Sequence, residues 1–366
     1  MLADVIVSEH YPLRLFARNC IPILGANIAN RFRSMAVVMS ASAFYVGLDV
    51  GGTTMKASVV DDTGRAAPSV SMPTEPHKGQ DHGLATMCET IRRSVAAAGK
   101  TMADIAGIGV ATPGTMDIAA GIVLDPPNLK PWQNVQVKQY VHHHFKIPTA
   151  FQNDANAAAY GEYWVGAGRE VKSMVLFTLG TGVGGGIIVD DKVLEGQHSH
   201  GGEVGHMKID LKNGRLCGCG RLGCLEAYAS ATAVVKRARE ALQEDGGHSR
   251  LRQLLKNEEE EFSSRAIFIA AEEGDELAKR IVDDTAYYLA VGAMNLMHII
   301  DPDAVVFAGG MTAAGEPFLN RIRHYIGELA FPVPATRTLI RYAQLGSDAG
   351  FIGAAACAKY LVNGGL

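Results

Sequence analysis

Two stretches of the chain repeat one pattern of apolar strand, glycine turn and second apolar strand. In the first stretch, residues 44–50 are apolar apart from Asp49, the turn 51–54 reads Gly-Gly-Thr-Thr, and an apolar run at 55–60 ends in the acidic turn 61–64. Short apolar runs bounded by glycine and aspartate are typical of strands joined by tight turns. The pattern therefore predicts a β-hairpin with a glycine-rich loop.

The second stretch has the same order. Residues 173–179 are mostly apolar, 180–186 reads Gly-Thr-Gly-Val-Gly-Gly-Gly, and a second strand at 187–189 ends in the turn 190–192. The tetrapeptides VVDD and IVDD close the two hairpins. Because an internal repeat indicates a duplicated structural unit, we expect two similar α/β halves, each with a glycine loop that faces a shared central cleft.

Helical and buried-strand patterns alternate along the rest of the chain. Helices are expected at 86–98, 155–164, 231–243, 284–298 and 350–360, buried strands at 105–110 and 304–308, and a polar, solvated helical region at 251–276. Asn153 and Asp154 precede the helix at 155, and their side chains are suited to capping a helix N-terminus. The whole pattern predicts an α/β fold.

The hinge between the halves is expected near residue 150. The predicted parts are a small α/β domain at 44–150, a large α/β domain at 151–349 with a metal-binding loop at 206–226, and a small-residue C-terminal segment at 350–366 that packs back on the small domain. Residues 1–43 are expected to lie outside the core fold. That extension could reflect an over-early start codon, a transit-like arm or an oligomer-docking segment.

Composition excludes several functional classes. The chain has 366 residues, a formal net charge of −4 and a pI of about 6.3, so it lacks the basic footprint of a nucleic-acid-binding protein. No apolar run reaches the roughly 18 residues that span a bilayer. Six cysteines in a chain of this length do not make a disulfide framework, which favours the reducing cytoplasm. We therefore expect no nucleic-acid partner and no membrane partner.

The two glycine loops are the first candidate chemistry. Glycine lets backbone N–H groups approach phosphate oxygens, and Thr53, Thr54 and Thr181 add hydroxyl donors. Asp49, at a strand end, could hold Mg²⁺ through water. The alternative is a plain hairpin with a polar tip, but two such loops could clamp a triphosphate from both sides. Neither loop matches the P-loop pattern, and dinucleotide binding is poorly supported.

The second candidate for chemistry is the pair Asn153-Asp154. It could simply cap a helix, or Asp154 could also accept the proton of a substrate hydroxyl that attacks a γ-phosphate. Both roles are compatible, since the carboxylate would sit at a rigid helix start and the neighbouring amide could hold other hydroxyls.

The third is a cluster of one histidine and three cysteines, His206, Cys217, Cys219 and Cys224. Three thiolates and an imidazole form a closed, structural zinc site; a disulfide or free thiols are the alternatives. Glu203 lies three residues before the histidine, where it could be a turn residue or an acceptor held beside the metal. The run 142–144 is also histidine, but consecutive side chains diverge, so we interpret it as a solvated helix face.

Seven motifs, in order, resemble those of the ROK family of sugar kinases, bacterial glucokinases in particular, from about residue 45 to the C-terminus. They are LDVGGTTMK, GVATPG, PPNL, QNDANAAAYGE, LGTGVGGG, GEVGH and CGCGRLGCLE. The resemblance implies the two-lobed, actin-like (ribonuclease H-like) ATPase fold. Unlike the family's repressors, this chain shows no helix-turn-helix pattern in its first 44 residues, which makes a regulator the weaker reading.

The resemblance also implies roles for individual residues. Asp154 would be the catalytic base. The sugar would contact Asn128, Asn153, Asp154, Glu203, His206 and Glu226; the nucleotide would contact Asp49, Gly51, Gly52, Thr53, Thr54, Lys56, Thr181, Gly182, Gly184, Gly309 and Gly310; and structural Zn²⁺ would bind His206, Cys217, Cys219 and Cys224.

The activity expected on this basis is phosphoryl transfer from Mg·ATP to the 6-hydroxyl of glucose in the cytoplasm, by a homodimer or homotetramer. Alternatives are a ROK kinase for N-acetylmannosamine, N-acetylglucosamine, fructose or allose, and a sugar-sensing regulator without catalysis. Polyphosphate is a less expected phosphate donor.

Overall fold

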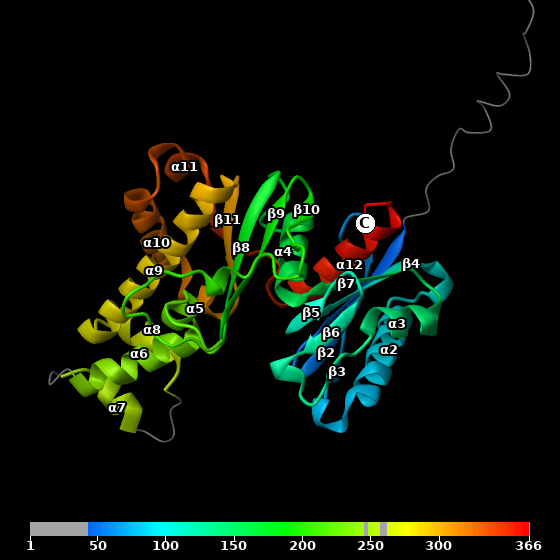
Figure 1. Cartoon of the computed structure of the whole chain (residues 1–366), viewed down its shortest axis with the longest axis horizontal. Helices are drawn as coiled ribbons and strands as arrows, with labels where there is room; N and C mark the ends of the chain where they lie inside the picture. The colour runs from blue at the N-terminus through cyan, green and yellow to red at the C-terminus, as the bar shows by residue number, and fades with distance from the viewer. Residues whose placement is uncertain (1–42, 245–247, 257–261, 366) are drawn as a thin grey trace, which may run out of the picture. The chain divides into compact units, whose positions relative to one another are not determined.

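The computed structural model describes residues 43–244, 248–256 and 262–365 (Figure 1). The predicted extension at 1–43 therefore lies, except for Ala43, outside the described residues. Within the described ranges, no helix is long and apolar enough to cross a membrane.

The first sheet contains the first predicted hairpin. Its strands are β1 (Phe44–Val50), β2 (Thr54–Asp61), β3 (Val70–Pro73), β4 (Ile105–Thr112) and β7 (Thr149–Asn153). They lie in the order β3-β2-β1-β4-β7, with β3, β2 and β1 antiparallel and β1, β4 and β7 parallel. A separate hairpin is formed by β5 (Thr115–Asp117) and β6 (Ile122–Asp125).

The second sheet repeats this architecture. Its strands are β8 (Ser173–Leu179), β9 (Val183–Val189), β10 (Lys192–Val193), β11 (Ala304–Ala308) and β12 (Leu339–Tyr342). The order β10-β9-β8-β11-β12 has the same succession of antiparallel and parallel pairs as the first sheet. The duplication predicted from the two hairpins is therefore confirmed.

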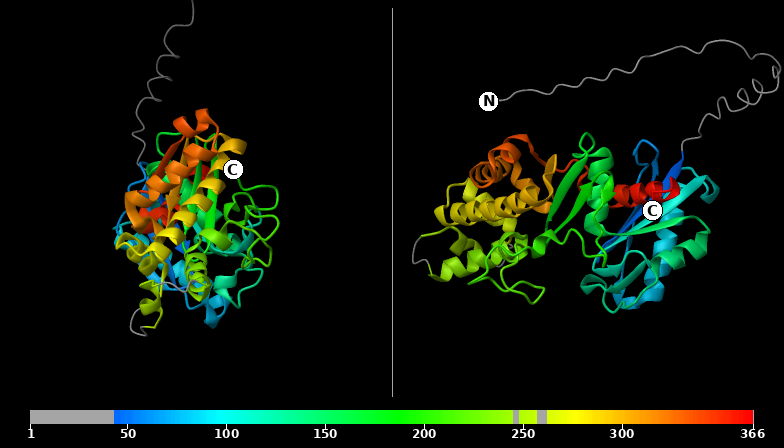
Figure 2. Two further views of the ribbon diagram at one scale, coloured as in Figure 1. Left: turned by 90° about the vertical axis from the view of Figure 1, so that its left-hand side faces the viewer. Right: turned by 45° about the horizontal axis from the view of Figure 1, so that its top comes forward.

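Helices cover both sheets. They are α2 (Gln80–Ala97), α3 (Val137–Phe145), α4 (Asp154–Val165), α5 (Glu226–Ala229), α6 (Ala231–Glu244), α7 (Leu251–Lys256), α8 (Ser264–Glu272), α9 (Glu276–Ile300), α10 (Gly315–Leu329), α11 (Pro332–Arg337) and α12 (Ala349–Val362). The long α9 and α10 pack side by side (Figure 2). Because helices lie on both faces, β1 and β4 are buried almost throughout, as in other parallel sheets.

The C-terminal helix α12 approaches the first sheet and α4 unusually closely, because glycines face it. A Cβ at Gly47 of β1 or Gly109 of β4 would collide with the backbone of α12, and a Cβ at Gly353 of α12 would collide with the carbonyl of Ala157 in α4. The alanine- and glycine-rich sequence of α12 is thus explained by backbone contact rather than by large apolar side chains.

The region 251–276 differs from its prediction as one solvated helical stretch. It contains the separate helices α7 and α8, with 257–261 outside the described residues, and α8 buries Ile267, Phe268, Ala270 and Ala271. These four positions lie on one helical face, so α8 joins the core of the second half. The prediction was wrong because neighbouring charges concealed a short apolar face.

Candidate functional site

The first glycine loop joins β1 to β2 and is held from one side by a buried threonine. Gly51 N–H donates to the carbonyl of Thr54 (2.9 Å), Thr74 N–H donates to the carbonyl of Thr53 (2.9 Å), and Thr74 Oγ1 donates to the carbonyl of Gly51 (2.7 Å). Thr74 is fully buried, and the sequence pattern did not single it out. These bonds stabilise the turn while leaving Thr53 and Thr54 exposed.

The same loop lies against a predicted sugar contact. A Cβ at Gly52 would lie 3.0 Å from the carbonyl oxygen of Asn128, a residue of the short 3-10 turn Pro127–Leu129. The fold therefore brings the first predicted phosphate loop next to one predicted sugar residue, although 76 positions of sequence numbering separate Gly52 from Asn128.

The second glycine loop joins β8 to β9 and contacts another predicted sugar residue. Val183 N–H donates to Glu226 Oε2 (3.1 Å), and a Cβ at Gly182 would collide with that same oxygen. A Cβ at Gly184 would lie 3.4 Å from the Cβ of Ala155, at the start of α4. Thr181 is exposed in this loop. The second loop is thus in contact with both Glu226 and the helix that carries Asp154.

Asp154 is the first residue of α4, and the N-cap residue is Asn153. Asn153 Oδ1 accepts from the N–H groups of Ala155 (2.9 Å) and Asn156 (3.2 Å), and Asp154 Oδ1 also accepts from Ala155 N–H (2.8 Å). The predicted capping role of Asn153 is confirmed. The Asn153 side chain also hydrogen-bonds to the Asp154 carboxylate, so the same residue caps the helix and orients the neighbouring carboxylate.

Burial raises the pKa of Asp154 to about 6, and the nearby charge of Glu203 adds to this effect, while the hydrogen bond from Ala155 opposes it. Burial likewise raises the pKa of Asp49 to about 7; the negative charge of Asp154 raises it further and Lys56 lowers it. The two aspartates therefore lie close enough to influence each other. Two neighbouring carboxylates with raised pKa values are typical of a functional site rather than of a surface.

Lys56 and Gly350 complete the surroundings of Asp49. Lys56 Nζ lies 2.6 Å from Asp348 Oδ1, at the start of α12, and donates to Ser347 Oγ (3.2 Å). A Cβ at Gly350 would collide with the carboxylate of Asp49. The first residues of α12 thus shape the pocket around this carboxylate, and Lys56 is bound to them, a partner that sequence reasoning missed.

The predicted nucleotide contacts Gly309 and Gly310 follow the end of β11. Gly309 has a φ of +94°, and a Cβ there would collide with the backbone of Leu179, the last residue of β8. Nothing lies within 4 Å of a Cβ built at Gly310. Gly309 therefore lies beside the second glycine loop, and Gly310 faces open space.

The predicted metal ligands come together. One ligand atom from each of His206, Cys217, Cys219 and Cys224 lies within 4.8 Å of all the others. Cys219 Sγ is 3.7 Å from Cys224 Sγ, and Cys217 Sγ is 3.8 Å from His206 Nδ1. Tetrahedral zinc with bonds of about 2.3 Å to sulfur places its sulfur ligands about 3.8 Å apart, so the four side chains fit such an ion.

The metal group and the predicted sugar residues share contacts. His206 directs Nδ1 toward Cys217, while its Nε2 lies 4.0 Å from Glu203 Oε2. Glu226 Oε1 accepts from Cys217 Sγ (3.2 Å), and its other oxygen accepts from the second glycine loop. Both His206 and Glu203 have exposed side chains, at 37% and 52%. His206 and Glu203 are therefore accessible, while Glu226 is only partly exposed.

Two buried polar residues escaped the sequence analysis, Gln152 just before α4 and Glu162 within it. Gln152 Oε1 accepts from Asn153 N–H (2.8 Å) and Asn156 Nδ2 (3.2 Å), while its Nε2 donates to Glu195 (2.7 Å). Glu162 accepts from the N–H groups of Ala167, Gln344 and Leu345. Their positions within the QNDANAAAYGE motif could have drawn attention to them, but some of their partners, Glu195, Gln344 and Leu345, are far away in the sequence. A cavity of about 450 Å³ borders Gln152 and Glu195, beside the predicted sugar residues rather than among them.

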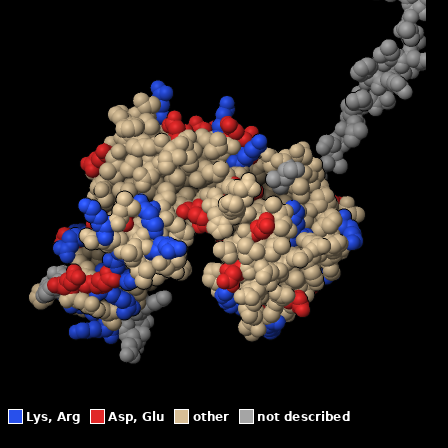
Figure 3. Space-filling model, viewed as in Figure 1, with Lys and Arg blue, Asp and Glu red and all other residues tan. Residues whose placement is uncertain are grey.

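The histidines at 142–144 lie on α3 and are exposed, which agrees with their interpretation as a solvated helix face. Only the group at 206–224 offers a set of metal ligands among the described residues. On the face seen in Figure 3, acidic and basic side chains are interspersed rather than gathered by sign.

Comparison with known proteins shows which family this chain resembles. The sequence model of the ROK family matches residues 45–360. The glucokinase of Halalkalibacterium halodurans is 35% identical over 311 residues, which cover 85% of this chain and 93% of that protein. The xylose repressor of Caldicellulosiruptor bescii is 33% identical over 273 residues, 74% of this chain and 66% of the repressor.

Solved structures of ROK proteins have the same architecture as this chain. The ROK hexokinase of Thermus thermophilus aligns with a TM-score of 0.74 and 31% identity, covering 87% of this chain and 99% of that one. A ROK family glucokinase from Streptomyces griseus, solved with glucose and AMPPNP, aligns with a TM-score of 0.70 and 31% identity over 86% of this chain and 99% of its own. The two-lobed α/β fold expected from the sequence motifs is therefore confirmed.

Proposed function

Because this chain belongs to the ROK family, we propose that it is an ATP-dependent sugar kinase that phosphorylates the 6-hydroxyl of glucose. The observation that carries this proposal is Asp154, a carboxylate with a raised pKa at the start of α4, close enough to Glu203 and to Asp49 for their charges to influence one another. The similarity to glucokinases, one of them solved with glucose and a nucleotide analogue, supports glucose and ATP as the substrates.

In this mechanism Asp154 accepts the proton of the sugar hydroxyl as that oxygen attacks the γ-phosphate. A pKa of about 6 leaves the carboxylate mostly ionised at pH 7 yet more basic than an ordinary aspartate, which suits a general base. The hydrogen bond from Ala155 holds the carboxylate in place, so the proton is accepted at a fixed position.

The glycine loops supply donors for the phosphates. Loop N–H groups and the exposed Thr53, Thr54 and Thr181 would bind phosphate oxygens, as backbone nests do for other anions. Mg²⁺, when bound with ATP, would neutralise phosphate charge, and Asp49 is the residue proposed to hold it through water. The raised pKa of Asp49 fits a buried carboxylate that lacks a full positive partner.

The sugar is proposed to lie against Asn128, Asn153, Glu203, His206 and Glu226. His206 would bind zinc through Nδ1, which faces Cys217, and would present Nε2 to a sugar hydroxyl. Binding the metal through one nitrogen sets the tautomer of the ring and so makes Nε2 a hydrogen-bond donor. The metal would thus orient a sugar contact without taking part in phosphoryl transfer.

A coupled assay of ADP formation with a panel of sugars tests this proposal. Glucose should give the highest kcat/KM among glucose, fructose, allose, N-acetylglucosamine and N-acetylmannosamine. A higher kcat/KM for another member would keep the kinase and replace its substrate. No ADP formation with any sugar would refute the kinase.

A sugar-sensing regulator is the second candidate, favoured by the similarity to a xylose repressor. Such a protein would bind sugar and DNA without forming ADP. Electrophoretic mobility shifts with genomic DNA fragments, with and without sugar, distinguish it from the kinase.

A further inference from the structure

The loop at 206–226 is held at a point away from its predicted metal ligands. The hydroxyl of Tyr228 accepts from the N–H of Arg215 (2.8 Å) and donates to Asp210 Oδ2 (3.0 Å). Asp210 and Arg215 lie five residues apart in the loop, so one hydroxyl bridges the two ends of this short segment. Tyr228 is only 6% exposed, and its hydroxyl is the shared partner of both groups.

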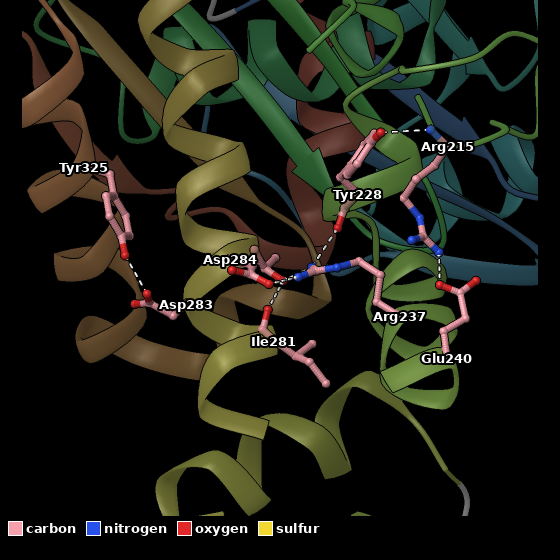
Figure 4. Close-up of polar contacts among 9 residues, drawn as sticks. Arg215, Tyr228, Arg237, Glu240, Ile281, Asp283, Asp284 and Tyr325 are labelled. Carbon is pink, nitrogen blue, oxygen red and sulfur yellow. Dashed lines mark hydrogen bonds and ion pairs between the residues drawn. The ribbon is translucent and has the colours of Figure 1, made fainter. Parts of the chain in front are cut away.

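A buried arginine holds the backbone carbonyl of Tyr228 (Figure 4). Arg237 of α6, 8% exposed, donates to the backbone carbonyl of Tyr228 (3.2 Å) and to Thr285 Oγ1 (2.9 Å). Its other terminal nitrogen lies 2.7 Å from Asp284 Oδ2, on α9. The position of Tyr228 is therefore set by α6 and α9, which belong to the core of the second half.

The predicted sugar residue Glu226 is in the same short helix as Tyr228. Helix α5 spans only Glu226–Ala229, so a shift of Tyr228 moves the backbone of Glu226 as well. Glu226 in turn contacts Cys217 and the second glycine loop. Tyr228 thus connects α6 and α9, through its backbone carbonyl, to the metal loop, through its hydroxyl, and shares its helix with a predicted sugar contact.

We propose that Tyr228 is a positioning residue for sugar binding, whose hydroxyl holds the 206–226 loop in its binding conformation together with the metal. The inference rests on the proposed function for its sugar but not for its loop contacts. Two separate restraints act on one loop, the metal at 206, 217, 219 and 224 and the hydroxyl at 210 and 215, so weakening either should loosen the other.

Tyr228→Phe is the direct test, because it removes only the hydroxyl and keeps the ring packed 4.8 Å from that of Tyr288. The loss of a buried hydroxyl that makes two hydrogen bonds should raise the KM for glucose roughly tenfold. The kcat should stay within about twofold, since a loosened binding loop affects sugar capture more than phosphoryl transfer at saturation.

Tyr288→Phe is the matched control. Its hydroxyl makes no hydrogen bond among the described residues, and its ring packs against that of Tyr228 and against Arg237. KM and kcat of this variant should equal those of the unaltered protein. If both variants changed KM equally, the effect would come from general packing, and the positioning role would be wrong.

A second measurement does not depend on catalysis. Each protein is loaded with one equivalent of zinc, and metal transfer to a chromogenic chelator is followed over time. Tyr228→Phe should release zinc several-fold faster than the unaltered protein and Tyr288→Phe, and glucose should slow the release in all three. If Tyr228→Phe does not fold, Asp210→Ala, which removes the acceptor of the Tyr228 hydroxyl, should accelerate release in the same way.

The outcomes separate the two proposals. Unaltered KM or unaltered zinc release in Tyr228→Phe would overturn the positioning role, even if the protein is a glucokinase. Absence of kinase activity in the unaltered protein would refute the proposed function, while faster zinc release from Tyr228→Phe would still support the hydroxyl as the second restraint on the loop.

Discussion

Replacement of Asp154 by asparagine should stabilise the protein while abolishing most of its activity. Burial raises the pKa of Asp154 from 3.8 to about 6, so the ionised carboxylate is less favourable in the folded chain than in the unfolded one. Each pH unit of such a difference corresponds to about 1.4 kcal/mol. The ionised side chain therefore costs up to about 3 kcal/mol at pH 7, of which asparagine should recover about 1–2 kcal/mol because it accepts a weaker hydrogen bond from Ala155.

The sign of this stability difference can be checked by its dependence on pH. A carboxyl group whose pKa is raised on folding binds more protons in the folded state between pH 3.8 and about 6, so its ionisation penalty is full above pH 6 and disappears as the pH falls toward 4. The stability difference between Asp154→Asn and the unaltered protein should therefore be largest at pH 7–8 and small near pH 4.5. Urea unfolding at several pH values measures it.

Asp303→Asn is a control with the opposite sign. The N–H of Lys172 and then the N–H and hydroxyl of Ser173 lower the pKa of Asp303, with burial opposing them. Its ionised form stabilises the folded chain, so the asparagine variant should be less stable at pH 7, and this loss should shrink as the pH falls through the lowered pKa.

Kinetic measurements on Asp154→Asn complete the test of its role as the base. Asp154→Asn should lower kcat by at least about a hundredfold, the contribution typical of a general base, and kcat/KM of the unaltered protein should fall about tenfold per pH unit below pH 6. Near-normal turnover in Asp154→Asn would remove it as the base. An asparagine variant less stable than the unaltered protein at pH 7 would refute the argument from burial.

Three further predictions concern the metal, the second glycine loop and the oligomeric state. Purified protein should contain about one equivalent of zinc by elemental analysis, and Cys219→Ser or chelation should raise the KM for glucose before the fold is lost; metal-free protein with an unchanged KM would contradict this. Gly182→Ala should lower kcat/KM at least tenfold, because the new methyl group displaces the Glu226 carboxylate. Gly327→Ala in α10, outside the predicted site, adds a methyl group that meets nothing within 4 Å and should be nearly neutral in the same assay. Light scattering should give the mass of a dimer or tetramer, and a monomer would refute that expectation.

Local sequence patterns were sufficient for the elements whose signals are short-range. The two hairpins, the capping of α4 by Asn153 and the spacing of the metal ligands depend on residues close together in the chain, where backbone geometry limits what each pattern can form. The helix α2 begins at Gln80 and α9 at Glu276, both earlier than predicted. The missed start of α9 buries Leu277, Ala278, Ile281 and Val282 at helical spacing.

The sequence by itself determined the duplicated α/β plan, the two glycine loops and which side chains could bind metal, since each depends on local pattern and residue chemistry. Only the tertiary structure decided which of these meet. It places Glu226 against Gly182, Asp348 on Lys56, and Tyr228 between two parts of the metal loop. The raised pKa of Asp154 also belongs to this level, because burial and the approach of Glu203 depend on packing between distant segments.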